Sequence, residues 1–196
     1  HLVTLKKVFG EEVRTEVADL LDFFADRLKV QMRETGVRHD LIAAVFATPK
    51  PEGGAEDDLV RLLARVDALS TFLATEDGAD LLTAYKRAAN IVAIEEKKDK
   101  QTYDGEIDRD LLAEGDEAAL YEAIEVARGG IGGLLAAEDF TGAMTELAKL
   151  RPSVDAFFDS VTVNCDDEKL RANRLRLLSH IRAALNQVAD FSLIEG

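Results

Sequence analysis

The amino-acid sequence predicts an all-α protein built as an antiparallel helical bundle. Its composition favours helix, because 47% of the residues are hydrophobic while only 6% are aromatic and only three are proline. In most segments the apolar residues recur every three or four positions, and short polar turns separate these segments. We find no alternating strand pattern and no internal repeat. The 196 residues suffice for one large domain or two small ones.

Four helices are expected in the first half of the chain. The first covers residues 11–35 and should end at Gly36. A short second helix starts at position 39 or 40 and stops before the prolines and glycines of residues 49–54. The third covers residues 59–73, and an aspartate at position 57 or 58 suits the positive end of its dipole. The fourth begins at position 81 or 82 and fades at residues 95–98.

The middle of the second half is less regular. Residues 99–108 form a polar run that we expect to be an exposed connection, followed by a brief turn at 111–112. A helix from about Asp116 should be interrupted or bent by the glycine-rich segment 129–133, since each glycine costs about 1 kcal/mol relative to alanine in a helix interior. Another helix covers residues 139–150.

Two more helices should close the chain. Pro152 ends the preceding helix or opens one that covers residues 154–161. Asp166 or Asp167 caps the final helix. That helix carries the most regular apolar stripe of the chain, formed by Leu175, Leu178, Ile181, Leu185 and Val188.

The net charge of −14 argues at first against a nucleic-acid partner, because phosphate binding depends largely on lysine and arginine. Most of the excess negative charge lies in residues 49–164, however, and basic clusters remain available towards both ends of the chain. An acidic face can also repel RNA from the wrong docking surfaces. The overall charge therefore does not exclude RNA binding.

The sequence predicts neither a metal site nor a catalytic site in this chain. His1, His39 and His180 are far apart and lack the partner four residues away that a helical metal site would show. Cys165 is the only cysteine, which excludes an internal disulfide framework. The glycine-rich segment 129–133 follows no strand and precedes no Lys-Ser/Thr pair, so helix bending is a better interpretation than a phosphate-binding loop.

The chain is expected to be cytoplasmic and not to associate with a membrane. No apolar run approaches the roughly 20 residues that span a bilayer, and no charged and apolar leader opens the sequence. A single cysteine fits a reducing compartment. The sequence starts without an initiator methionine, which suggests a segment of a longer polypeptide.

Arg174 is expected to form a structural ion pair. On a helical wheel it falls within the apolar stripe of the last helix, and a guanidinium that faces a core must be paired. Asp155 and Asp159, four residues apart on the preceding helix, are the expected partners. Two alternatives remain open: an RNA-binding role for Arg174, and acid and base roles for the two aspartates.

Two basic groups are candidates for RNA binding. Lys86, Arg87 and Asn90 lie on one flank of the fourth helix, and Lys97 and Lys98 continue past its end. The last helix projects a second group outside its apolar stripe, formed by Lys169, Arg171, Arg176 and Arg182. Charge clusters on helices are mostly solvated faces. Together, however, the two groups could form a split phosphate-contacting surface, with Asn90 reading a base edge.

Five motifs, in this order, resemble the C-terminal region of the β subunit of bacterial two-subunit (α2β2) glycyl-tRNA synthetase. They are Arg38-His39-Asp40-Leu41-Ile42, Lys86-Arg87-Ala88-Ala89-Asn90-Ile91, Pro152 to Asp159, Leu170 to Leu178 and Val188-Ala189-Asp190-Phe191-Ser192. The resemblance covers nearly the whole chain. It implies a DALR-type anticodon-binding domain over residues 76–196, preceded by helices of the β-subunit body over residues 1–75.

The resemblance also implies a division of labour. In this family the α subunit activates glycine with ATP and Mg²⁺, and the β subunit supplies most tRNA contacts. This chain would then bind the anticodon end of glycine tRNA, make no adenylate itself, and pack against the remainder of the β subunit and the α subunit. The family's patterns fall on Lys86, Arg87 and Asn90, and on the segment Leu170, Arg171, Asn173 and Arg174. The alternative is a purely structural helical module that packs against the synthetase without recognising bases.

Overall fold

The computed structural model describes residues 11–48, 58–112 and 115–195, with side chains from residue 23 onward. Within these ranges all regular structure is helical, so the all-α prediction is confirmed. The α-helices are α2 (Glu11–Glu34), α3 (His39–Phe46), α4 (Leu59–Leu73), α5 (Glu76–Asp99), α6 (Asp116–Ala136), α7 (Phe140–Ala148), α8 (Arg151–Ser160) and α9 (Glu168–Leu185). Two short 3₁₀ turns accompany them, η1 (Arg109–Leu111) and η2 (Phe191–Leu193).

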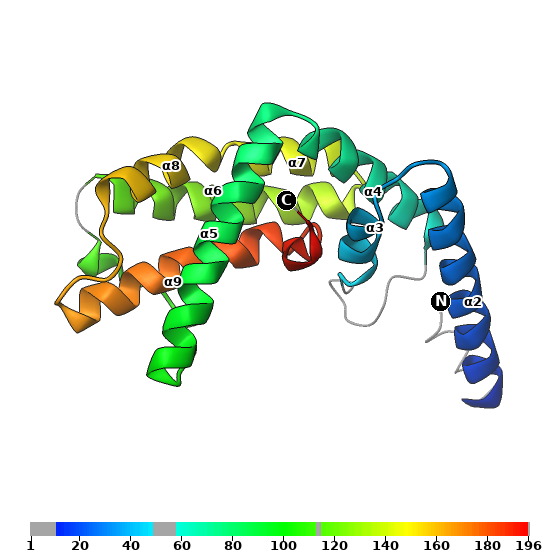
Figure 1. Cartoon of the computed structure of the whole chain (residues 1–196), viewed down its shortest axis with the longest axis horizontal. Coiled ribbons are helices and arrows are strands. Elements are labelled where there is room, and N and C mark those ends of the chain that lie inside the picture. Colours follow the sequence, from blue (N-terminus) through cyan, green and yellow to red (C-terminus); the bar gives the residue numbers. More distant parts are fainter. Residues whose placement is uncertain (1–10, 49–57, 113–114, 196) are drawn as a thin grey trace.

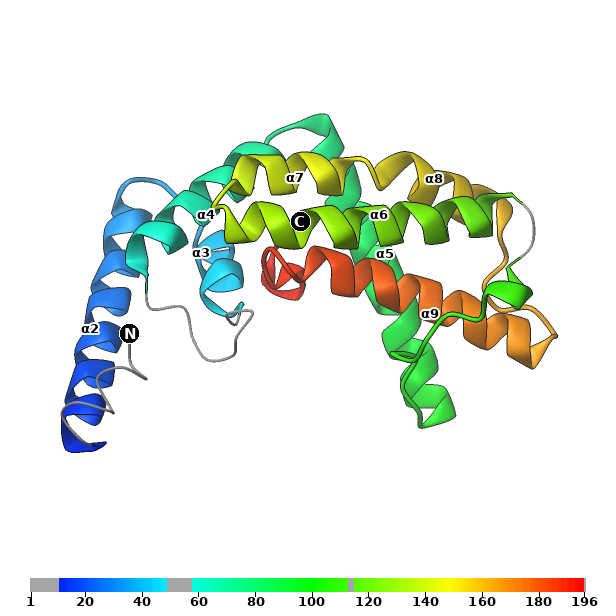
Figure 2. The ribbon, with the colours of Figure 1, turned by 180° about the vertical axis from the view of Figure 1, so that it is seen from behind.

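Helices α6 to α9 form a layer of antiparallel rods, in agreement with the predicted bundle. The rod formed by α7 and α8 runs antiparallel to α6 and to α9, with α6 between them (Figure 2). Helix α5 crosses this layer in front of α9 and packs on both α9 and α8 (Figure 1). Helices α3 and α4 continue the molecule at one end, and α2 stands beyond them. One long helix therefore lies across one side of the bundle.

Side-chain caps explain where several helices begin. Asp58 accepts hydrogen bonds from the N–H groups of the first turn of α4, and Thr75 does the same for α5. Asp139 and Asp167 cap α7 and α9 in the same way. Each cap satisfies N–H groups that have no partner inside the helix, which is worth about 1 kcal/mol. Asp58 and Asp167 are among the positions that the sequence predicted.

Three details differ from the sequence-based expectations. Helix α5 starts at Glu76, several residues before the predicted position, because Thr75 caps it. The connection after α5 is not simply exposed, since Tyr103 and Ile107 are buried. Helix α6 continues through the glycine-rich segment 129–133. The burial of Ile131 and Leu135 on that helix offsets the low helix propensity of the glycines.

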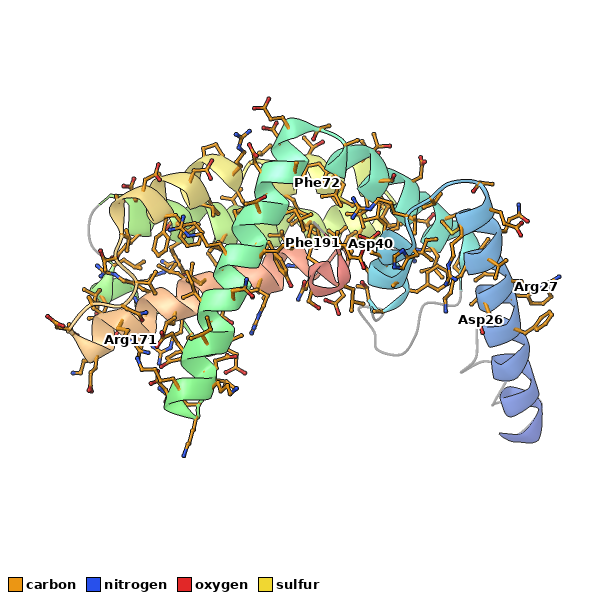
Figure 3. The ribbon with its side chains drawn as sticks, in the orientation of Figure 1. Asp26, Arg27, Asp40, Phe72, Arg171 and Phe191 are labelled. Atoms are coloured by element: carbon orange, nitrogen blue, oxygen red, sulfur yellow. The ribbon has the colours of Figure 1, made fainter. Side chains whose placement is uncertain are left out.

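Glycine has opposite roles at two positions, which gives a testable contrast. A Cβ atom on Gly78 would lie 2.1 Å from the carbonyl oxygen of Phe72, because α5 starts directly after α4 ends (Figure 3). Gly78→Ala should therefore lower the free energy of unfolding by about 2 kcal/mol or more in urea titrations. A Cβ on Gly129 meets nothing within 4 Å, so Gly129→Ala should raise it by up to about 1 kcal/mol. Equal effects of the two substitutions would contradict this account.

One hydrophobic core runs through the described residues and joins the early helices to the last ones. Phe191 of η2 packs against the ring of Tyr85 with 5.5 Å between centroids. The Asn186 side-chain oxygen accepts hydrogen bonds from the Tyr85 hydroxyl and the Phe191 N–H. Within the described ranges, no helix combines the length and apolar character needed to cross a bilayer. The division into 1–75 and 76–196 stays a prediction.

Candidate nucleic-acid interface

Helix α5 presents a cationic face to solvent. Five residues make up this α5 face: Lys86, Arg87, Asn90, Ile94 and Lys97. Their spacing places them on one side of the helix, opposite the buried side that packs on α9. Arg87, Asn90 and Lys97 are exposed, and 63% of the Ile94 surface is accessible. Between Asp80 and Glu95 the helix carries no acidic residue, so the charge of this face is positive.

Arg87 lies over an aromatic ring. Its guanidinium carbon is 4.0 Å from the centroid of the Phe158 ring, which belongs to α8. Phe158 also meets Phe157 edge-on, with 5.7 Å between the ring centroids, and Phe157 is fully buried. The Phe158 ring is thus held by the core while Arg87 remains exposed. Among the residues that the structure describes, none forms a hydrogen bond or ion pair with the side chains of Arg87, Lys86, Asn90 or Lys97.

Arg171 has a different environment from the α5 face. Its guanidinium forms ion pairs with Glu95 and, at 2.6 Å, with Asp99, both near the end of α5. It also donates to the Tyr103 hydroxyl at 3.3 Å and to the Asn164 side-chain oxygen at 3.1 Å. Figure 3 shows Arg171 between α9 and the C-terminal half of α5. Arg171 therefore joins α5 to α9. Because only 16% of its side chain is exposed, little of its surface remains for RNA.

These contacts shift the pKa values of the partners. The hydrogen bond from Arg171 is the main cause that lowers the pKa of Glu95. The pKa of Asp99 is lowered by hydrogen bonds from Tyr103 and then from Arg171. In return, the hydrogen bonds to Asp99 and Glu95 raise the pKa of Arg171 despite its burial. All three groups therefore stay charged at neutral pH.

The predicted partners of Arg174 are wrong. Arg174 forms its ion pair with Glu117 of α6, and it donates to the carbonyl oxygen of Thr162 at 2.8 Å. Asp155 instead lies 3.5 Å from Arg151 in its own helix, and Asp159 is exposed. The inward, paired character of Arg174 was anticipated, but a helical wheel gives only the direction of a side chain. Glu117, 3% exposed, belongs to α6, and the spacing of apolar residues does not predict that α6 lies next to α9.

The Leu170–Arg174 motif as a whole holds α9 in place. Arg171 reaches α5 and Arg174 reaches α6, as described above. Between them Asn173, 1% exposed, exchanges two hydrogen bonds with the backbone of Asp108, at 2.8 and 2.9 Å. Three polar side chains of one helix thus contact three different neighbours. We assign this motif a structural role.

The two predicted basic groups do not converge. The side-chain nitrogen of Arg176 is the nearest atom to the Cβ position of Gly105, in the connection that follows α5. Figure 2 shows this connection running over the opposite side of α9 from α5. Arg176 lines a hollow there in which carboxylates match the cations, with Asp99, Asp108, Glu168, Lys169 and Arg171 in the same lining. The expected split surface of both helices is therefore not formed.

Arg182 occupies an intermediate position. Its guanidinium is 4.0 Å from the Glu96 carboxylate of α5 and 3.5 Å from the Ser179 hydroxyl. The Lys98 ammonium is likewise 3.3 Å from the Glu95 carboxylate.

The RNA-binding candidates divide into two sets. Lys86, Arg87, Asn90 and Lys97 form one surface, while Arg171, Arg176 and Arg182 lie outside it. The RNA-binding role of each of these residues stays a prediction.

The candidate interface lies within a segment that matches a known family. Residues 81–193, more than half of the chain, match the DALR anticodon binding domain. The chain belongs to this family. The α5 face and the whole of α9 lie inside the matched DALR segment.

Similarity to individual proteins extends the match to nearly the whole chain. The chain is 62% identical over 179 residues to the glycine-tRNA ligase beta subunit of Rhodospirillum centenum, covering 91% of this chain and 24% of the relative. It is 55% identical over 192 residues to that of Phenylobacterium zucineum, covering 98% and 27%. For the Ruegeria relative the identity is 46% over 195 residues, covering 99% and 28%. The resemblance stated from the five motifs is confirmed, and the chain spans about a quarter of the length of these relatives.

Two parts of the DALR domain were missed by sequence reasoning. The sequence predicts that Glu95 lies where the fourth helix fades and that Asp99 opens an exposed connection, yet both bind Arg171. Phe158 belongs to the Pro152 to Asp159 motif and had no predicted role of its own, yet it supports the exposed Arg87. The spacing of Arg87 among lysine and asparagine gave no sign of an aromatic neighbour 71 positions later in the sequence. Only the crossing of α5 over α8 brings the two together.

Proposed function

We propose that this chain is the anticodon-binding part of a glycine-tRNA ligase β subunit, and that the α5 face contacts the anticodon arm of glycine tRNA. The observation that carries the proposal is a cationic, solvent-facing α5 surface inside a DALR domain. The names of the relatives indicate that the tRNA is the one for glycine. A helix face with lysines and arginine suits the phosphate backbone, and asparagine suits a base edge.

In this proposal the chain positions tRNA and performs no chemistry itself. The α subunit activates glycine with ATP and Mg²⁺ and transfers it to tRNA, while the remainder of the β subunit connects the two sites. Binding energy at the anticodon then helps to align the distant acceptor end. The enzyme would act in the cytoplasm, where glycine tRNA is charged.

Charge reversal on the α5 face tests this function in the assembled ligase. Lys86→Glu with Lys97→Glu should raise the KM for glycine tRNA about tenfold or more and make binding less steeply dependent on salt. Glycine-dependent exchange of pyrophosphate into ATP, which needs no tRNA, should stay unchanged. A control reverses two exposed cations elsewhere, Arg128 of α6 and Lys149 directly after α7.

The outcomes separate the proposal from its rival. Loss of tRNA affinity only in the α5 double variant supports the proposal. If both double variants charge tRNA like the unmodified ligase, the α5 face does not bind RNA, and a purely structural module becomes the better description. The same conclusion follows if the unmodified ligase is insensitive to changes in the anticodon.

A further inference from the structure

We propose that Arg87 and Phe158 form a stacking site for one unpaired base of the anticodon loop, and that Asn90 hydrogen-bonds the edge of that base. This inference rests on the proposed function and specifies how the α5 face would recognise a base as well as a phosphate. It concerns one pair of side chains from two helices, α5 and α8.

The Arg87 guanidinium is already arranged as a stacking surface. Its central carbon lies 4.0 Å from the centroid of the Phe158 ring, a separation that allows the two planar groups to stack. Guanidinium planes stack equally well on nucleic-acid bases, which is one of the ways in which proteins hold unstacked bases. Because Arg87 is exposed, a base can approach the side of the guanidinium that Phe158 does not cover.

No described carboxylate competes for Arg87. Most arginines of the neighbouring helices are occupied: Arg151 binds Asp77 and Asp80, Arg171 binds Glu95 and Asp99, and Arg174 binds Glu117. Arg87 instead has an aromatic neighbour and, within the part of the chain that the structure describes, no ion pair. Its charge is thus available to an anionic ligand, while the ring beneath it limits its rotation.

Residues one and two turns further along α5 complete the site. Asn90 follows Arg87 by three positions and is exposed, so its amide offers both a donor and an acceptor to a base edge. Ile94 lies one turn beyond and keeps 63% of its surface accessible, which gives an apolar contact for a ribose or a second base. Lys86 and Lys97 flank this line of residues and suit the phosphates on either side.

The chemistry favours a base over a lone phosphate at Arg87. A phosphate requires only positive charge, and lysine supplies this at positions 86 and 97. Phosphate binding does not need an aromatic ring on one side of the cation, whereas a ring that covers one side of the guanidinium leaves the other side for a stacked base. The combination of plane, amide and flanking lysines therefore fits a single-stranded loop.

The test uses the assembled ligase and glycine tRNA with 2-aminopurine at each anticodon position in turn. Transfer of a base from the anticodon stack to Arg87 should raise the fluorescence at one position, because the neighbouring bases no longer quench it. Arg87→Lys, which keeps the charge but removes the plane, should reduce this rise and weaken tRNA binding about tenfold. Phe158→Leu, which keeps an apolar contact with the core, should have a similar but smaller effect. Far-ultraviolet circular dichroism and thermal melts confirm that each variant is folded.

Arg109→Lys is the matched control. Arg109 also lies over an aromatic ring, 4.7 Å from the centroid of Tyr121, but it belongs to η1 and is hydrogen-bonded to the Tyr121 hydroxyl. The control variant should show the same fluorescence rise and the same tRNA affinity as the unmodified ligase. Equal losses in Arg109→Lys and Arg87→Lys would overturn the proposal.

The failure of this inference can be told apart from failure of the proposed function. If the unmodified ligase distinguishes anticodons but Arg87→Lys keeps the full fluorescence rise, the stacking site is wrong and the function stands. If tRNA binding weakens without any change in fluorescence, Arg87 contacts a phosphate or another protein segment, and the stacking site is again wrong. If the unmodified ligase does not distinguish anticodons, the proposed function itself fails.

Discussion

Replacing Arg171 by leucine is expected to lower the free energy of unfolding by about 3 kcal/mol or more. The substitution keeps an apolar stem between α5 and α9 but removes the positive charge that Glu95, 8% exposed, depends on. Glu95 would keep the Asn164 amide and the exposed Lys98, but a buried carboxylate that loses its main charged partner still costs several kcal/mol. The loss is measured by urea or thermal unfolding of the chain, followed by circular dichroism.

Arg176→Leu provides the control for this prediction. Arg176 lies on the next turn of the same helix, faces the connection after α5, and forms no ion pair within the described ranges. Its replacement should change the stability by less than about 0.5 kcal/mol. Arg171→Lys should fall between the two, since lysine retains the charge but cannot form the branched contacts of a guanidinium. Equal stabilities of the Arg171→Leu and Arg176→Leu variants would contradict the structural role of Arg171.

The effect of Arg171→Leu should also depend on pH. The pKa of Glu95 is held below its usual value in the folded chain, chiefly by Arg171, and that of Asp99 by Tyr103 and Arg171. Lowered pKa values contribute stability above the unfolded values of about 4, and this stability is lost as the pH falls through the folded values. The difference between the original chain and the Arg171→Leu variant should therefore be largest at neutral pH and shrink below about pH 4.

The helices were predictable because their signals are local. Apolar residues spaced by three or four positions predicted α2, α4 and α9, and the aspartates before α4 and α9 predicted their first turns. Helix α6 shows the limit of such signals. Five residues of Gly-Gly-Ile-Gly-Gly argued for a break, but Ile131 and Leu135 pack into the core and keep the helix continuous. Tertiary burial here outweighs the local preference.

The candidate site was only half predictable, because its pairings join distant parts of the sequence. The spacing of Lys86, Arg87 and Asn90 correctly placed them on one exposed helix face. The same reasoning treated Arg171 as a similar surface cation, yet 76 positions separate it from its partner Glu95. A wheel specifies the direction of a side chain, whereas the partner depends on which helices pack together.

Asp40→Ala is the second substitution with a large expected effect. Asp40 is 3% exposed and forms a double contact with the Arg38 guanidinium. Its carboxylate also accepts from the N–H of Glu195 at 2.8 Å, and Arg38 donates to the Glu195 carbonyl oxygen at 2.5 Å. Figure 3 shows Asp40 beside Phe191, where α3 meets the C-terminal turn. One carboxylate thus fastens the end of the described chain to α3.

We expect Asp40→Ala to lower the free energy of unfolding by about 2 kcal/mol, because the N–H of Glu195 and the Arg38 guanidinium lose their acceptor. The expected loss is smaller than for Arg171, since Arg38 is 53% exposed and water can replace part of the contact. Amide hydrogen exchange should accelerate first in residues 191–195, because the contacts of Asp40 and Arg38 with Glu195 hold this segment against α3. Asp190→Ala is the control, because the half-buried Asp190 carboxylate accepts hydrogen bonds only from Ser192 within η2.

The pH dependence gives an independent check on this contact. Burial alone raises the pKa of Asp40, but the hydrogen bonds from Arg38 and from the Glu195 N–H outweigh burial and hold the pKa below its usual value. The stabilisation is therefore complete above the unfolded value of about 4 and disappears as the pH falls through the folded value. The gap between the original chain and Asp40→Ala should close in acid. If the gap widened in acid, the carboxylate would be protonated in the folded chain at neutral pH, and Arg38 would not be its partner.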